Sequence, residues 1–180
     1  MFIPVGHSGQ LRHPDTRAAW VMEDQTVPKY HLAELNIGRL RAPKDDPRVA
    51  DFINNLDRIN GLGKRMPGFI WMMEGEAGQG NTATAINGDP QFIPNLTVWE
   101  NSDTLETFVF NTLHAKFMNR RAEWFTVLDQ MHFAMWWVPA GHKPTLQEAL
   151  LRLETLRRDG DTAQAFGWDY LRANPAPPVA

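Results

Sequence analysis

The sequence contains no cysteine, and this absence excludes several classes of site at once. A chain without thiols has no disulfide framework, no thiolate nucleophile and no zinc or iron–sulfur site built on cysteine. Other metal sites would need histidine and carboxylate ligands, but the sequence shows no HExxH motif and no tight cluster of such residues. We therefore expect no bound metal, and the lack of cysteine fits a reducing cytoplasm.

Basic charge and long apolar runs are also scarce. The formal net charge is -3, so the chain lacks the basic surface that nucleic acids and anionic membranes attract. The most apolar stretch, 133–138, is far too short to cross a bilayer. Residues 1–10 do not read as a signal peptide. We expect no nucleic-acid partner, no membrane association and a cytoplasmic location.

Motifs for nucleotide binding and for hydrolysis are missing as well. Gly78 and Gly80 lie in a long polar segment, 75–94, without the Lys and Ser/Thr of a P-loop. They also lack the direct strand-to-helix setting of the dinucleotide fingerprint, and no Gly-x-Ser-x-Gly motif marks a nucleophile elbow. Loops of this length in compact domains often bind ligands or act as lids.

Large aromatic side chains are what the sequence has in excess. The 180 residues are 43% hydrophobic, enough for one domain with a real core. Seven Trp and ten Phe indicate either a well-filled core or an aromatic-lined pocket. We expect an irregular lead-in over 1–29, a single domain over 30–173, and a frayed, proline-rich tail over 174–180.

Hydrophobic periodicity predicts strands over 30–37, 69–74, 95–100 and 132–138. Three helices lie between and after these strands, and their starts are marked by Asp46 with Pro47, by Ser102 or Asp103, and by a capping box of Thr145 with Glu148. The apolar stripe of the second helix extends through Leu113 and continues toward Phe125. Gly160 ends the third helix.

This order of elements predicts an α+β fold of the ferredoxin-like kind, with a four-stranded antiparallel sheet and an extra C-terminal helix. The strands are apolar on both faces, with Phe69, Trp71 and Met73 expected on one face of the second strand. A second apolar face needs a second cover. We expect a second copy of the chain, which gives a homodimeric α/β barrel. The alternative is the third helix of the same chain, folded across the sheet.

Several stretches resemble one family of uncharacterised bacterial proteins. They are 95–101 (NLTVWEN), 105–108 with His114, 121–125, and 136–149 beginning WWVPAGH. This is a domain-of-unknown-function family within the dimeric α/β-barrel superfamily, which also includes the antibiotic-biosynthesis monooxygenases. The resemblance spans about 30–170 and is specific for the family, not for a reaction.

The resemblance implies an enzyme but does not identify its reaction. Relatives in the superfamily include cofactor-free quinone-forming monooxygenases and haem-degrading enzymes. It therefore implies a cofactor-independent, monooxygenase-like oxidoreductase acting on a small hydrophobic or aromatic compound. The alternative is a non-catalytic dimer that binds a small ligand or haem. In the haem-degrading branch a strand Asn, a helix Trp and a helix His line the pocket. This chain has Asn36 and His114, but Phe108 stands near the place of the Trp, which speaks against haem degradation.

The candidate catalytic residues are His114 and Asn36. His114 follows the apolar stripe of the second helix, where a neutral imidazole can act as a general base or bind iron, or simply bond to a backbone carbonyl. Asn36 is polar in an apolar strand and can bond either a substrate oxygen or a neighbouring backbone group. The aromatic residues expected to line the substrate pocket, against the alternative of core packing, are Trp71, Trp99, Phe108 and Trp136.

The remaining histidines carry weaker expectations. His31 and His132 begin the first and fourth strands, which we place at opposite edges of the sheet, so these residues should not meet within one subunit. His142 precedes the third helix, and we expect it to order that turn.

Overall fold

The computed structural model describes residues 30–75, 86 and 88–177. The expected lead-in, most of the long loop and the last residues of the tail lie outside these ranges. The strands are β1 (Tyr30–Arg39), β2 (Phe69–Met72), β3 (Phe92–Trp99) and β4 (Phe133–Pro139). The helices are α1 (Ala50–Gly63), α2 (Ser102–Asn111), α3 (Leu113–Asn119), α4 (Leu146–Asp159) and α5 (Trp168–Ala173).

The four strands form one sheet in the order β2-β3-β1-β4, and every neighbouring pair is antiparallel. This is the strand order of two interleaved βαβ units, so the predicted ferredoxin-like fold is confirmed. The expectation that the first and fourth strands occupy opposite edges is wrong, because β1 lies in the centre and pairs with β4. His31 and His132 are still apart, since antiparallel pairing places them at opposite ends of this pair.

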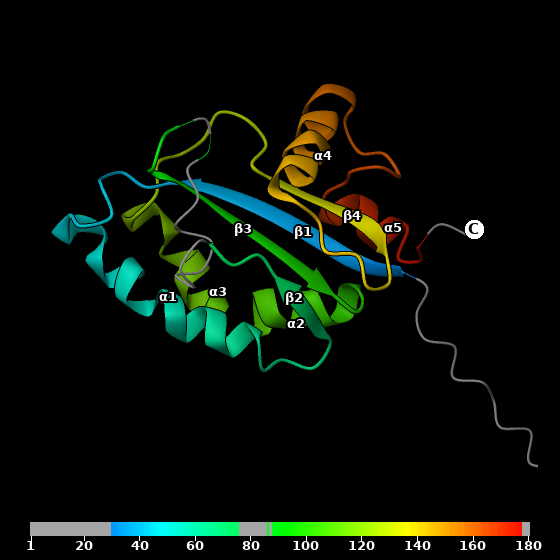
Figure 1. Ribbon diagram of the computed structural model, residues 1–180, viewed down its shortest axis with the longest axis horizontal. Helices are drawn as coiled ribbons and strands as arrows, with labels where there is room; N and C mark the ends of the chain where they lie inside the picture. Colours follow the sequence, from blue (N-terminus) through cyan, green and yellow to red (C-terminus); the bar gives the residue numbers. More distant parts are fainter. Residues whose placement is uncertain (1–29, 76–85, 87, 178–180) are drawn as a thin grey trace, which may run out of the picture.

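Helices α1, α2 and α3 cover one face of the sheet, as Figure 1 shows below the strands. Their apolar side chains join the even-numbered positions of β1 and the odd-numbered positions of β3 and β4 in one core cluster, which includes Leu32, Ile59, Trp99, Leu105, Phe108 and Met135. Burial of such side chains is worth roughly 25 cal/mol per Å² of apolar surface. Packing against the sheet therefore stabilises these three helices.

The predicted second helix is two helices. Thr112 stands between α2 and α3 in an extended conformation, with φ -122° and ψ -172°. Its hydroxyl donates to the Phe108 carbonyl at 2.7 Å and accepts from the His114 amide at 3.1 Å. Thr112 thus ends one helix and caps the next. The cap of α2 is Asn101, rather than Ser102 or Asp103, and its side chain accepts from the Thr104 amide at 3.0 Å.

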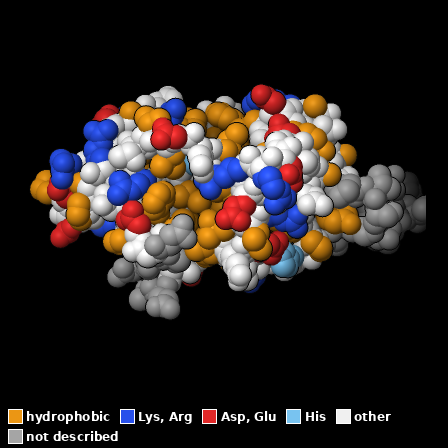
Figure 2. All heavy atoms as spheres, turned by 90° about the horizontal axis from the view of Figure 1, so that it is seen from above, with side chains coloured by type: hydrophobic (Ala, Val, Ile, Leu, Met, Phe, Trp, Pro, Cys, Tyr) orange, Lys and Arg blue, Asp and Glu red, His pale blue; other side chains and the backbone are white. Residues whose placement is uncertain are grey.

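The opposite face of the sheet is covered by α4 of the same chain. Ala149, Leu153 and Leu156 of α4 are buried against Ala33 and Trp136 of the sheet. This is the alternative cover, so a second copy is not what covers the part of this face over β1 and β4. Seen from the α4 side, hydrophobic side chains remain visible in the middle of the face, between charged groups (Figure 2).

Capping at the start of α4 differs in part from the expected box. Thr145 accepts from the Glu148 amide at 3.1 Å, as predicted. The Glu148 carboxylate does not return to the Thr145 backbone; it accepts from the Trp136 indole at 3.3 Å and lies 2.8 Å from His142. His142 therefore ties the turn to α4, which is the role expected for it. Gly160, with φ 72°, follows the last residue of the helix.

A β-bulge changes which face the side chains of β2 take. Phe69 pairs with Trp99 and Trp71 pairs with Val98, so the register shifts between them at Ile70. Phe69 consequently packs with the α1–α3 core, whereas Trp71 and Met73 pack with the α4 core. The expectation that these three residues share one face is wrong, because simple alternation does not survive a bulge.

Candidate active site

A buried carboxyl group lies at the centre of the sheet, on the face that α1–α3 cover. Glu34 of β1 pairs with Thr97 of β3 and with Met135 of β4, and Met72 of β2 pairs with Thr97. These directly paired residues form one row across all four strands and share a face. Glu34 is 3% exposed and is the only acidic residue among the buried polar positions of the described chain.

The Glu34 carboxyl is held by a fixed set of donors. The Asn36 amide nitrogen donates to Oε1 at 2.8 Å, and the Thr97 hydroxyl donates to Oε2 at 2.9 Å. The Trp99 indole nitrogen donates in turn to the Thr97 oxygen at 3.0 Å. Since the indole N–H occupies an acceptor site of Thr97, the single hydroxyl proton of Thr97 remains directed at Glu34.

Burial raises the pKa of Glu34 from 4.5 to about 7, while the hydrogen bonds from Asn36 and Thr97 act in the opposite direction. Removing water disfavours the charged carboxylate, and the two donors only partly compensate. A carboxyl group with such a pKa exchanges its proton near neutral pH. That is the property of a general acid or base, and perturbed groups of this kind mark candidate functional sites.

The row next to Glu34 on the same face is less enclosed. Asn36 pairs with Asn95 on β3 and with Phe133 on β4, and all three are half-buried. The row that contains Glu34 is therefore more deeply buried than the neighbouring row that contains Asn36. Because the Asn36 nitrogen donates to Glu34, its carbonyl oxygen is the atom that can accept from another molecule.

His114 lies at the start of α3, half-buried beneath the break between the two helices. Its Nδ1 is 3.3 Å from the Val109 carbonyl oxygen, which requires a proton on Nδ1 and leaves Nε2 as the acceptor. Burial lowers the pKa of His114, against the opposing effect of the Val109 bond, so the ring is neutral at pH 7.

The two candidate catalytic residues do not touch each other. His114 packs against Phe108 with ring centroids 4.8 Å apart, and Phe108 stacks on Trp99 at 5.1 Å. Trp99 reaches Glu34 through Thr97, and Glu34 bonds Asn36. The structure thus places both residues on the same layer, joined by a chain of contacts whose centre is Glu34.

The four aromatic residues expected to line the pocket lie on two different faces. Trp99 and Phe108 stack together on the face that contains Glu34. Trp71 and Trp136 pack with α4 on the other face. One ligand cannot touch all four, and only the first pair adjoins the candidate site.

The other histidines lie away from Glu34. His31 is buried on the α4 face of the sheet, and its Nδ1 has no hydrogen-bond partner among the described residues. His132 is exposed just before β4, and His142 is engaged with Glu148. Within the described part of the chain, no three His, Asp or Glu side chains are grouped to hold a metal ion.

Sequence reasoning did not single out Glu34, although a signal was present. Glu34 and Asn36 are two residues apart in an apolar strand, which places both side chains on one face. Thr97 is likewise the polar residue inside NLTVW. Three polar side chains on strands that face a buried layer need one another as partners. Recognising them as one cluster required the pairing of β1 with β3.

The family model described as Domain of unknown function (DUF3291) matches residues 31–178. No curated protein matches the chain. In the described ranges, no helix has the length and apolar character needed to span a membrane.

Several crystal structures are similar to the chain at low identity. PA3566 from Pseudomonas aeruginosa aligns with a TM-score of 0.43 at 11% identity, over 64% of this chain and 98% of its own. NE2512, a protein of unknown function from Nitrosomonas europaea, gives 0.42 and 11%, over 66% and 96%. SnoaB, a cofactor-independent oxygenase from Streptomyces nogalater, gives 0.42 and 14%, over 66% and 98%. Likeness at this level assigns no function.

Proposed function

The chain belongs to the DUF3291 family, and we propose that it is a cofactor-independent, monooxygenase-like oxidoreductase in which Glu34 acts as the general base. Its substrate is a small hydroxylated aromatic compound. The observation that carries the proposal is the buried Glu34 carboxyl, whose pKa is raised to about 7 and whose two oxygens are held by Asn36 and Thr97.

Glu34 has the properties that proton abstraction from an aromatic hydroxyl requires. A base works best when its pKa lies near the working pH, because a useful fraction is ionised and the proton transfer is not strongly uphill. The donors from Asn36 and Thr97 keep the carboxylate in one orientation without a bound cation. A positioned base of this kind contributes about 10²–10⁴-fold to the rate.

Asn36 supplies the group that orients the substrate. Its nitrogen donates to Glu34 at 2.8 Å, so its carbonyl oxygen is the atom left to accept from a ligand. A hydroxyl group can then donate to the Asn36 oxygen or to Glu34, whereas an ether cannot. This preference for a donor fits an aromatic alcohol.

The proposed reaction uses molecular oxygen as the oxidant. Glu34 takes the hydroxyl proton, and the resulting arenolate transfers one electron to O₂. The radical pair then forms a carbon–oxygen bond at a ring carbon that carries hydrogen, and the proton held by Glu34 returns to the peroxide, which gives a hydroperoxide. Loss of water from that hydroperoxide yields a quinone, so one arenol and one O₂ give one quinone and one H₂O. The oxygen step comes from the family resemblance; the described residues supply the base and the orienting amide.

The test is oxygen consumption with a panel of naphthols and anthrols, for the wild-type protein and Glu34→Gln. We expect turnover of at least one arenol, and a loss of about 10²–10⁴-fold in Glu34→Gln. Glu154→Gln is the matched control, because Glu154 is exposed on α4. Equal activity in wild type and Glu34→Gln would contradict the assignment of the base.

The second candidate is a non-catalytic protein that binds a small ligand or haem through His114. The neutral ring with its free Nε2 favours it, because that is the form that ligates iron. However, haem needs an open slot beside the ligating imidazole, and the Phe108 ring packs against His114 at 4.8 Å. The described residues therefore do not fit haem. We expect a haemin titration to give no Soret shift that depends on His114; a saturable shift lost in His114→Ala would favour this candidate.

A further inference from the structure

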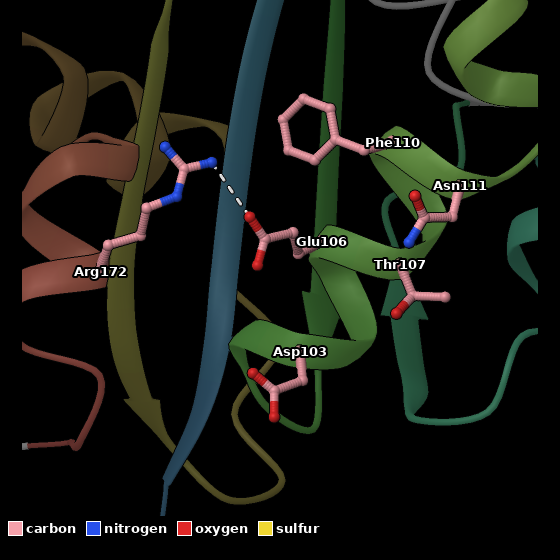
Figure 3. A pocket seen from close by; sticks show the side chains of 6 residues that line it. All are labelled: Asp103, Glu106, Thr107, Phe110, Asn111 and Arg172. Carbon is pink, nitrogen blue, oxygen red and sulfur yellow. Dashed lines mark hydrogen bonds and ion pairs between the residues drawn. The ribbon is translucent and has the colours of Figure 1, made fainter.

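A groove on the surface lies between α2 and α5 (Figure 3). Both helices pack on the face of the sheet that contains Glu34. Its volume is about 400 Å³, within the range of small-molecule sites. It is lined by Asp103, Glu106, Thr107, Phe110, Asn111 and Arg172. The lining combines one aromatic ring, which can stack on a flat ligand, with hydroxyl, amide and charged groups that can bond its polar substituents.

The charges of the groove disfavour an anionic ligand. Arg172 is held by Glu106 at 3.0 Å, the contact drawn in Figure 3, and lies 3.6 Å from Asp169. Its positive charge is therefore already matched by carboxylates. Asp103 adds a further negative charge to the lining, and its carboxylate accepts from the Ser102 hydroxyl at 3.4 Å. A carboxylated ligand would meet net repulsion, whereas a neutral or cationic one would not.

Aromatic contacts connect the groove with the candidate active site. Phe110, which is 39% exposed, meets the edge of Trp168 with ring centroids 5.3 Å apart. Trp168 stacks on Phe133 with ring centroids 5.9 Å apart, and the Arg172 Cζ atom lies 5.7 Å from the centroid of the Trp168 ring. Phe133 pairs with Asn36, which bonds Glu34 at 2.8 Å. Trp168 therefore contacts both Phe110, which lines the groove, and Phe133, which lies in the half-buried row beside Glu34.

We propose that the groove between α2 and α5 is where the substrate binds on its way to Glu34, and that it selects neutral or cationic hydroxyaromatic compounds over carboxylated ones. Phe110 stacks on the ligand at the mouth, and Trp168 forms the inner wall that must turn aside for the ring to reach Asn36. This inference rests on the proposed function, since it names the route and the substrate class of that same site.

Binding can be tested without turnover by following the indole N–H signals of ¹⁵N-labelled protein. The probes are 2-naphthol, 2-naphthoate and 1-naphthylmethylammonium, with Trp168→Phe used to assign its signal. We expect the first and third probes to shift the Trp168 signal saturably, and 2-naphthoate to bind at least tenfold more weakly. The Trp71 signal is the internal control, because Trp71 packs on the other face of the sheet.

A pair of variants tests whether the mouth is correctly placed. Phe110→Ala should weaken 2-naphthol binding about fivefold through the loss of one aromatic contact. Leu151→Ala, which removes an exposed apolar side chain from α4, should leave it unchanged. No shift at Trp168, equal binding of 2-naphthoate, or equal loss in both variants would overturn the inference. An active enzyme with no shift at Trp168 would refute only this route, and binding without oxygen consumption would refute only the proposed reaction.

Discussion

Glu34 couples the stability of the fold to pH. In the unfolded chain its carboxyl loses its proton near pH 4.5, and in the folded protein near pH 7. Between these values the folded state binds a proton that the unfolded state has lost. Raising the pH through this window therefore favours unfolding, and the contribution present below about pH 4.5 is gone above about pH 7. The difference corresponds to about 3 kcal/mol.

Urea unfolding of wild type and Glu34→Gln at about pH 4 and about pH 8 measures this coupling. Other groups with shifted pKa values, such as Asp46, titrate alike in both proteins and cancel in the difference. Relative to wild type, Glu34→Gln should gain about 3 kcal/mol of stability between the two pH values. A difference that does not change with pH would show that Glu34 titrates normally in the folded state.

Thr97 should act on the reaction through Glu34. Its hydroxyl lowers the pKa of Glu34 by donating to the carboxylate, so Thr97→Val should raise that pKa further. The pH dependence of kcat/KM should shift to higher pH, because the Glu34 carboxyl then ionises at a higher pH. Thr97→Ser keeps the donor and should restore the wild-type profile. A loss of activity with an unchanged profile would indicate that Thr97 only supports packing.

At the scale of secondary structure, the break at Thr112 fixes where His114 lies. Its hydroxyl bonds the Phe108 carbonyl and caps α3 through the His114 amide. Thr112→Ala should cost about 1 kcal/mol, as loss of a cap does. Thr155→Ala is the control, since the Thr155 hydroxyl bonds Leu151 within the interior of α4 and caps nothing. Chemical denaturation measures the free energy of unfolding of both variants. Equal losses of stability in Thr112→Ala and Thr155→Ala would contradict the capping role of Thr112.

Most elements could be predicted from the sequence, but not every boundary or face. Asp46 caps the turn before α1, and Thr145 and Gly160 bracket α4, because these signals are local. The apolar stripe that runs from α2 into α3 predicts one continuous helix. The helix breaks at Thr112, whose hydroxyl bonds both the Phe108 carbonyl and the His114 amide. The bulge at Ile70 leaves no signal in the pattern of β2, since it depends on how β3 pairs with it.

At the scale of the whole molecule, the order of strands and helices was sufficient to predict the antiparallel sheet. The sequence does not show that α4 covers the second face of the sheet, because an apolar face can be covered by a helix of the same chain or by a second copy. Glu34 was missed for a similar reason: its partners Thr97 and Trp99 are more than 60 residues away along the chain. Only the pairing of β1 with β3 brings them together.

The expected homodimer remains a proposal, and the edge near β2 is the surface we propose for it. Ile70 is 41% exposed there, and Phe69, Trp71 and Met72 line a pocket beside it. We expect light scattering after gel filtration to give twice the monomer mass, and Ile70→Glu to give a monomer. Leu151→Glu, at an exposed position of α4, should stay dimeric. A monomeric wild type would contradict the proposed assembly.

The pKa of Glu34 in the folded protein tests most directly whether Glu34 can be the general base. Glutamate labelled with ¹³C at the carboxyl carbon gives one signal per side chain, and Glu34→Gln identifies the one that belongs to Glu34. We predict a midpoint near pH 7 for the Glu34 signal. A Glu34 midpoint near pH 4.5 would mean that water reaches the carboxyl freely, and the proposed base would be contradicted.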